Sequence, residues 1–301
     1  MAKAQVQRKR VYELTIGDMV SGNGFIIESS LQVRFDISKT SDNKRKGNSA
    51  TIEVYNLSPE HIKILDATEY AYCKFSAGYA DADGPLVVVE GNVVEIITVK
   101  KGTDYVSQIR MGEGYSALNH TKLKSLVGPG KRVEDAVDEV LTHLPGVARG
   151  AFTGTNLNNP ILYGYPLNGT PLDELSKLCE ANRMEFQVSG GVLNISDENG
   201  VLSKNQVLAP IVSEETGLIE VPFVTSAEGR KLPKDKKRRR GVQFKALLNA
   251  RYAPGFMVKI ESQRINGFFR INTARLTGDF RGGEWYVECF CADLHPEDLV
   301  K

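Results

Sequence analysis

Two stretches in which apolar and polar residues alternate, one near each end of the chain, constrain the fold more than any other feature. Near the N-terminus the alternation covers residues 30–37 and, after a polar loop, residues 50–57. Near the C-terminus it covers residues 268–276 and, after a glycine-rich turn, residues 284–291. Alternation with a period of two is typical of β-strands that bury one face. The repeated plan predicts two related β domains and favours an assembly component over an enzyme.

The first β domain is expected to span residues 1–115. Within it, residues 92–111 form a predicted hairpin whose turn lies at 101–104. A short helix is also predicted, because Ser58 can cap a helix whose first position is Pro59.

Residues 116–205 have a different pattern. Apolar residues at helical spacing predict a helix over 132–144 and a second helix over 170–183. Residues 185–195 alternate around a Gly-Gly turn, which predicts a tight hairpin. This region is therefore expected to be a small α+β module inserted between the two β domains.

Residues 206–301 return to short apolar runs separated by turns. Strands are predicted at 217–223, 242–248 and 256–260, before the final hairpin. The predicted fold class is thus mainly β, with two related β domains flanking an α+β module. The second β domain also contains a charged loop at 228–240.

Charge and cysteine content exclude several classes of protein. The 38 basic and 37 acidic residues give a net charge of +1, so no global charge directs the chain to nucleic acid or to an anionic membrane. Four cysteines in 301 residues are too few for a disulfide scaffold, which favours folding in a reducing compartment. The longest apolar run, 86–89, is far too short to span a bilayer, and the basic, polar N-terminus predicts no secretion signal.

No catalytic or cofactor-binding residue is predicted. The loop 125–132 has glycines before a helix, but it has Ser125 and Arg132 where a phosphate-binding loop needs Gly and Ser or Thr. A glycine turn into a helix explains it better. The four histidines are scattered and lie outside the known catalytic motifs.

No metal site is predicted either. Cys289 and Cys291 lie two residues apart on a predicted strand, so their side chains share a face, and His295 follows them. No second pair of ligands completes a zinc set, and buried free thiols are the favoured interpretation.

A basic run is the sharpest charge feature and the one candidate contact site. It could contact an acidic partner or phosphates, or it could be a solvated loop, because it has no interleaved aromatic residues for stacking on bases. The candidate residues are Arg230, Lys231, Lys234, Lys236, Lys237, Arg238, Arg239 and Arg240.

Several segments, in order, resemble the baseplate hub proteins of contractile-tailed bacteriophages, the tail hub or late-control-protein group. The resemblance covers most of the chain. It is carried by the Asn-x-Ala-x-Ile-x-Val-Tyr-Asn-Leu strand at 48–57, the middle segments 170–175, 183–186 and 191–195, the barrel opening at 241–249 with Pro254 and Gly255, and the closing residues 267–271, Gly278, Asp279, 283–285 and Cys289.

The resemblance implies that the two β domains are related tube-type β-barrels that flank the α+β module. It also implies a non-enzymatic structural protein located in the tail baseplate of a virion and assembled in the cytoplasm of a bacterial host. Three copies would form a ring with pseudo-sixfold symmetry that adapts a hexameric tail tube to a trimeric spike. The lumen would pass the tape-measure protein and then DNA, without sequence-specific binding. Other baseplate proteins would contact loops such as 39–49 and 228–240. No cofactor, metal or membrane span is implied.

Three other interpretations remain open from the sequence. One is a β-rich, tail-associated hydrolase of peptidoglycan, because the geometry of a catalytic triad is invisible in sequence order. Another is the corresponding hub of a secretion system. The third is a nucleic-acid binder that uses the basic loop.

Overall fold

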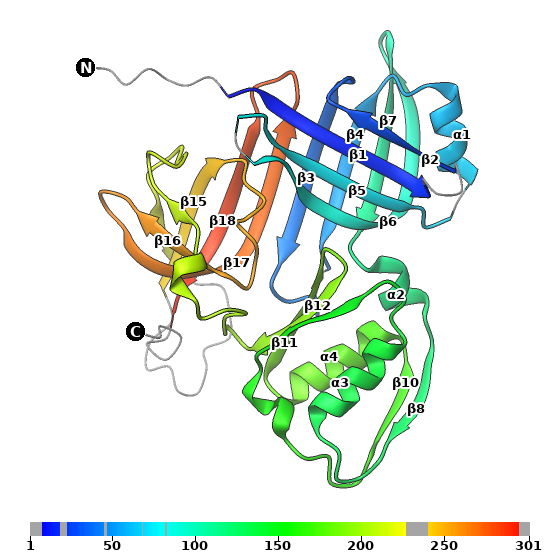
Figure 1. The fold of residues 1–301 in the computed structure, drawn as a ribbon, viewed down its shortest axis with the longest axis vertical. Helices are drawn as coiled ribbons and strands as arrows, with labels where there is room; N and C mark the ends of the chain where they lie inside the picture. The colour runs from blue at the N-terminus through cyan, green and yellow to red at the C-terminus, as the bar shows by residue number, and fades with distance from the viewer. Residues whose placement is uncertain are drawn as a thin grey trace.

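A computed structural model of the chain describes residues 8–18, 23–44, 47–67, 69–81, 83–226 and 240–294 (Figure 1). The fold is mainly β, as predicted, with few and short helices. One 13-stranded sheet contains strands from both ends of the chain, and two small sheets belong to the middle of the chain.

The N-terminal strands form the first β unit, in the order β3-β4-β7-β6-β5-β1-β2. Its long strand, β6, pairs with β5 up to Asn92 and with β7 from Asn92 onward, through an irregularity between Val93 and Glu95. Helix α1 begins as predicted, since the Ser58 hydroxyl accepts a hydrogen bond from the backbone N–H of His61 at 3.2 Å. The elements are β1 (Arg10–Asp18), β2 (Asn23–Glu28), β3 (Val33–Thr40), β4 (Ser49–Tyr55), α1 (Pro59–Ala67), β5 (Tyr72–Tyr79), β6 (Gly84–Lys101) and β7 (Asp104–Gly112).

The middle of the chain forms a module that lies apart from the large sheet (Figure 1). Its helices α3 and α4 bury the apolar stripes that the sequence predicts, and the hairpin β11–β12 forms around Gly190 and Gly191. The short strands β8, β9 and β10 were not predicted, because half or more of the residues in each are not buried. The elements are α2 (Tyr115–His120), β8 (Leu123–Val127), α3 (Val133–Thr142), β9 (Ala148–Phe152), η1 (Thr155–Asn158), β10 (Tyr165–Gly169), α4 (Pro171–Ala181), β11 (Met184–Ser189) and β12 (Val192–Asp197).

The C-terminal strands form a second β unit. The predicted strands at 242–248 and 256–260 correspond to β15 and β16, whereas the predicted strand at 217–223 is only bridged to β15 and regular pairing begins at Phe223. The elements are η2 (Gln206–Leu208), β13 (Ile211–Val212), β14 (Phe223–Ser226), β15 (Arg240–Leu247), β16 (Met257–Glu261), β17 (Asn266–Asp279) and β18 (Trp285–Asp293).

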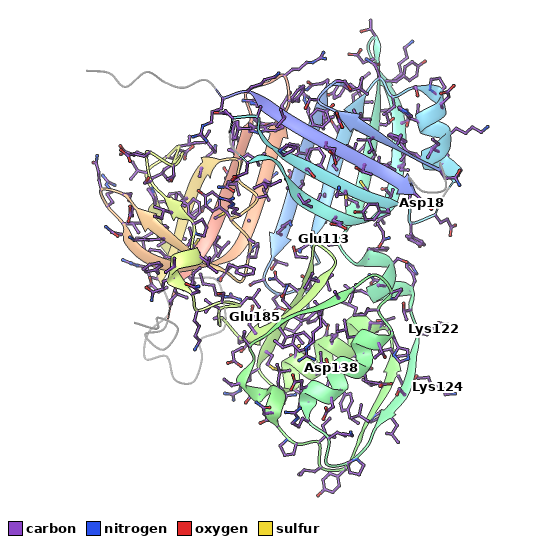
Figure 2. All side chains as sticks on the ribbon, in the orientation of Figure 1. Asp18, Glu113, Lys122, Lys124, Asp138 and Glu185 are labelled. Carbon is purple, nitrogen blue, oxygen red and sulfur yellow. The ribbon has the colours of Figure 1, made fainter. Side chains whose placement is uncertain are left out.

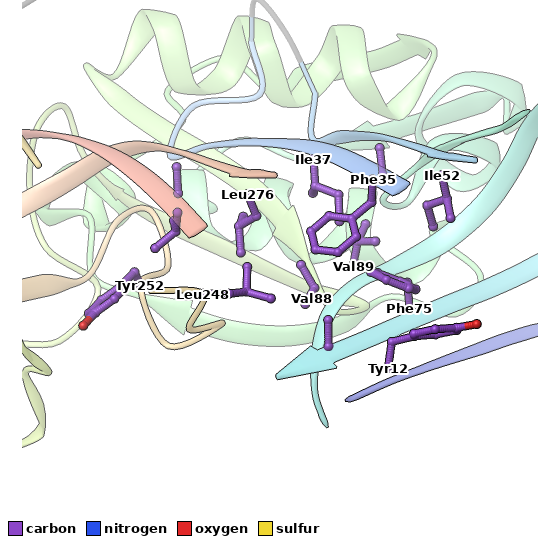
Figure 3. Close-up of a cluster of buried hydrophobic side chains, with 14 of the residues drawn as sticks. Tyr12, Phe35, Ile37, Ile52, Phe75, Val88, Val89, Leu248, Tyr252 and Leu276 are labelled. Atoms are coloured by element: carbon purple, nitrogen blue, oxygen red, sulfur yellow. The ribbon is translucent and has the colours of Figure 1, made fainter. Parts of the chain in front are cut away.

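The two β units share a strand. The first half of β17 pairs with β16, and its second half, Thr273–Asp279, pairs antiparallel with Arg34–Thr40 of β3. The same strand pairs with β18 along its length, through a register shift between Ile271 and Thr273. One hydrophobic core consequently runs through both units, from Tyr12 on β1 to Cys291 on β18. Figure 3 shows a part of this core, with Tyr12 of the first unit and Tyr252 of the second.

Close aromatic packing fixes the shared end of β17. The rings of Phe35 and Trp285 meet edge to face, with centroids 5.2 Å apart. Gly278 lies against both rings, and a Cβ atom at this position would overlap the Phe35 ring. Arg10 completes the corner by donating a hydrogen bond of 2.8 Å from Nη1 to the carbonyl oxygen of Asp279.

We expect Gly278→Ala to destabilise the protein by about 1–3 kcal/mol, because the added methyl group overpacks this aromatic contact. Gly283→Ala is the matched control, since a Cβ atom at Gly283 meets nothing within 4 Å. Urea unfolding followed by tryptophan fluorescence measures both variants. Equal midpoints for the two would contradict the packing described for β17.

Candidate functional surface

The most extensive functional candidate is one face of the sheet. Eight strands lie side by side in the order β14-β15-β18-β17-β3-β4-β7-β6. On β3, Val33, Phe35 and Ile37 are buried in the core, while Arg34 and Asp36 point to the opposite face. The strands around β3 alternate in the same way, so a polar face runs across both β units.

Charges on this polar face are paired across neighbouring strands. Arg275 on β17 binds both carboxylate oxygens of Asp36 on β3. Nζ of Lys245 lies 3.4 Å from Glu220 and 3.6 Å from Glu288. Two more pairs continue the pattern toward β6: Arg110 with Glu95 at 2.6 Å, and Lys101 with Glu53 at 3.5 Å. The face is therefore polar but close to electrically neutral.

Asp279 anchors the polar face at the end of β17. Its carboxylate accepts hydrogen bonds of 2.6 Å from Gln32 and 2.7 Å from Arg34. Although partial burial acts to raise the pKa of Asp279, these hydrogen bonds and the Arg34 charge hold that pKa below its ordinary value. The carboxylate stays ionised and keeps the β3–β17 corner closed.

Two shallow hollows lie on the polar face. Hydroxyl groups and paired charges line both of them, and Arg275 and Glu288 border each one. The first also contains Ser38, Thr40, Gln243 and Thr273, and the second contains Arg34, Asp36, Thr51 and Tyr286. Such open, charge-compensated surfaces suit sliding contact better than tight capture of a small ligand.

A buried ion pair attaches the middle module to the second β unit. Arg270 on β17 is 1% exposed, and its Nη2 donates to Oε2 of Glu185 on β11 at 2.7 Å. Its other nitrogens donate to the carbonyl oxygen of Gly200 at 2.6 Å and to Oδ1 of Asn272 at 2.8 Å. Ser41 also donates to Glu185 Oε2 at 3.1 Å. This arrangement satisfies both buried charges, as their removal from water requires.

A second buried carboxylate attaches the module to the first β unit. Oε2 of Glu113 accepts a hydrogen bond of 2.5 Å from Asn48, and Oε1 accepts one of 3.2 Å from the backbone of Gly190. Lys39 lies 3.4 Å from the same carboxylate. Figure 2 shows Glu113 and Glu185 at the boundary between the module and the large sheet. Together the two carboxylates hold the module at a fixed orientation.

The loop between β3 and β4 reinforces this junction. The backbone N–H of Asn43 donates to the carbonyl oxygen of Phe186 at 2.8 Å, and Nζ of Lys44 donates to that of Met184 at 2.9 Å. The described residues of the polar 39–49 loop, which was predicted as a contact for other baseplate proteins, thus contact the module of their own chain.

We expect Arg270→Met to destabilise the protein by about 3–5 kcal/mol, because it leaves the Glu185 carboxylate buried without its cation. The double variant with Glu185→Gln should recover part of this loss. Arg275→Met, which breaks an exposed pair, is the control and should cost at most about 1 kcal/mol. Chemical unfolding of the native protein, Arg270→Met, Glu185→Gln and the double variant forms a double-mutant cycle that measures the coupling; strictly additive losses would contradict it.

Most of the predicted contact residues, Arg230 to Arg239, lie outside the described residues. Arg240 begins β15, where Nη2 lies 3.5 Å from Oδ1 of Asp293 and the guanidinium lies 5.8 Å from the centre of the Phe269 ring. A role of this run in binding a partner stays a prediction.

The cysteines are buried free thiols, as predicted. Cys289 and Cys291 share the core face of β18, and burial raises the pKa of both thiols. His295 lies outside the described residues. These thiols face the core and away from the polar face.

Sequence reasoning missed Arg270, Glu185, Glu113 and Asn48. The partners lie 65 or 85 residues apart in the chain, so spacing could not pair them. The available signal was local: Arg270 interrupts the apolar run Phe268-Phe269-Arg270-Ile271, and Glu185 stands between Met184 and Phe186. A charged residue in such a run needs a buried partner.

Neither a protein-family model nor a curated protein matches the sequence. Solved structures do match the fold. A tail protein from Neisseria meningitidis has a TM-score of 0.64 at 13% identity, covering 94% of this chain and 96% of its own. This chain has the fold of phage tail proteins. A 43 kDa prophage tail protein from Shewanella oneidensis gives 0.63 at 9% identity, covering 96% of this chain and 99% of its own.

The fold also occurs in secretion machinery. An Escherichia coli component of the type VI secretion system, described as similar to two bacteriophage T4 tail proteins, has a TM-score of 0.63 at 11% identity. The match covers 88% of this chain and 74% of that one. In the part of this chain that the structure describes, no helix has the length and apolar character that crossing a membrane requires.

Proposed function

We propose that the chain is a structural, non-enzymatic component of a phage tail and acts as its baseplate hub. The observation that carries the proposal is the uninterrupted run of eight strands across two β units. Two tail proteins with the same fold over nearly their whole length support it.

Three copies of the chain form the proposed ring. Two β units per chain then give six positions around the ring, which match a hexameric tail tube on one side. The threefold symmetry of the whole chains matches a trimeric spike on the other side. A ring of identical head-to-tail contacts must close to avoid an open filament, and three copies satisfy this. The partners of this hub are itself, the tube, the spike and neighbouring baseplate proteins in the virion tail.

The polar face lines the proposed lumen. A passage for the tape-measure protein and DNA has to be wettable without holding phosphates. Arg275, Arg110 and Lys245 each have an acidic partner on a neighbouring strand, which limits their attraction for a polyanion. Because these basic side chains are paired with acidic ones, DNA can pass through the proposed lumen without being held there.

A hub of a secretion system is the second candidate. The observation that favours it is the type VI secretion component with the same fold and nearly the same TM-score as the tail proteins. The ring and the lining of the passage are the same in both proposals, and only the apparatus differs. An antibody against the chain, applied to phage tails isolated from a culture that makes the protein, distinguishes the two proposals. The antibody should bind the tails only if the chain is a phage-tail hub.

The purified chain should have a mass of roughly 100 kDa by light scattering, three times the 33.2 kDa chain, because the ring closes with three copies. Negative-stain images of the same fraction should show rings with a central hole. A monomer at all concentrations, or an open filament, would contradict the ring. Peptidoglycan release by the purified chain, abolished by a single acid-to-amide change, would instead support a tail-associated hydrolase.

The lumen proposal predicts how added charge changes DNA binding. Replacing Asp36, Glu53 and Glu288 with Lys leaves the polar face basic, so the variant should bind duplex DNA in a salt-dependent manner and the native ring should not. Each DNA phosphate that the variant neutralises should steepen the slope of log K against log salt by about 0.9. The control replaces the exposed Glu60, Glu69 and Glu180 with Lys. Fluorescence anisotropy measures binding, and equal affinities for both triple variants would contradict a lumen on this face.

A further inference from the structure

The eight-strand run ends in two strands that each have one unpaired side. Residues 94–101 of β6 pair with β7, while β5 pairs with β6 only up to Asn92. At the other end β14 pairs with β15. Within the described ranges, no strand pairs with the outer side of β14 or with the outer side of residues 94–101.

Both unpaired edges carry exposed apolar side chains. On β6 these are Val94, Ile97 and Val99, which are 40–43% exposed. On β14 they are Phe223 and Val224, which are 52% and 54% exposed. Edge strands of soluble proteins are usually protected by prolines, bulges or charges. On β6 the register is regular from Glu95 to Lys101, and lysines stand only at its far end, so seven residues of backbone remain ready for pairing.

Strand direction decides which edges can meet. All seven pairings from β14 to β6 are antiparallel, so the two terminal strands run in opposite directions. The β14 strand of a second copy can therefore lie beside β6 and continue the antiparallel pattern with the polar face still on the same side. Pairing of two like edges would leave the other apolar edge of each copy in water, whereas head-to-tail pairing covers both.

Apolar side chains at the two edges also lie on the same face of the sheet. Ile97 is opposite Gln108, and alternation puts Ile97 and Val99 on the polar face. Phe223 is opposite Gln243, which lines a hollow of the same face. An apolar strip would form where the two strands meet, in the middle of an otherwise polar surface. Cross-strand pairs of aromatic and β-branched residues stabilise such a contact.

We propose that copies of this chain join through one seam, in which β14 of one copy pairs antiparallel with residues 94–101 of β6 in the next copy. The proposal rests on the ring described above and names the surface that closes it. The partner at both edges is a second copy of the same chain.

Cross-linking tests the seam directly. The full-length double variant Val99→Cys, Phe223→Cys, treated with a short bifunctional maleimide, should give covalent dimers and trimers. No covalent oligomer larger than a trimer should form. Each single variant should stay a covalent monomer, because only unlike edges meet. The four native cysteines are buried and serve as an internal background control. Covalent dimers from a single variant would overturn the proposal in favour of like edges pairing.

Lysine substitutions provide a second measurement. Ile97→Lys with Val99→Lys should reduce the light-scattering mass from trimer to monomer with an unchanged circular dichroism spectrum. Leu162→Lys with Tyr163→Lys is the control, since these residues are 67% and 95% exposed on the module and lie outside the seam. A trimer that survives the β6 substitutions and gives no cross-links would sink the seam and leave the ring intact. A native chain that is monomeric and gives no cross-links would overturn both proposals.

Discussion

The pairing of β3 with the second half of β17 is the contact on which the rest of the structure depends. It joins strands from opposite ends of the chain, with Asp36 and Arg275 bound to each other across 239 positions of sequence. Without it the polar face would be two separate faces, and the eight-strand run would be interrupted between β17 and β3. The entropy of closing so long a loop is offset by the continuous core beneath the pair, in which Phe35 and Trp285 are in contact.

The sequence predicted the buried faces of strands and the positions of helices better than it predicted which strands lie side by side. Alternation identified which side of β3 is buried, and helical spacing located α3 and α4 within two residues at each end. Alternation carries no information on which strand lies alongside, so the union of the two β units through β17 could not be derived. The domain limits at 115 and 205 likewise stay predictions.

The candidate surface was invisible for a related reason. Its charges are ordinary in sequence, and they become a neutral, compensated face only when register sets Arg275 against Asp36 and Lys245 against Glu288. The junction with the module follows the same logic, because Glu113 and Glu185 acquire partners only in the folded chain. The basic run that stood out in the sequence was conspicuous because its charges are consecutive, a property unrelated to three-dimensional clustering.

The shared strand also imposes an order on synthesis. A ribosome releases β3 long before β17, and at about 5–20 residues per second the 239 residues between Asp36 and Arg275 take roughly 12–48 s. Throughout that interval, the edge of β3 with which β17 will pair has no partner strand from β17 in the nascent chain. The N-terminal β unit therefore waits for β17 before its sheet is complete, and during that delay a second nascent chain on the same messenger RNA could bind in place of β17.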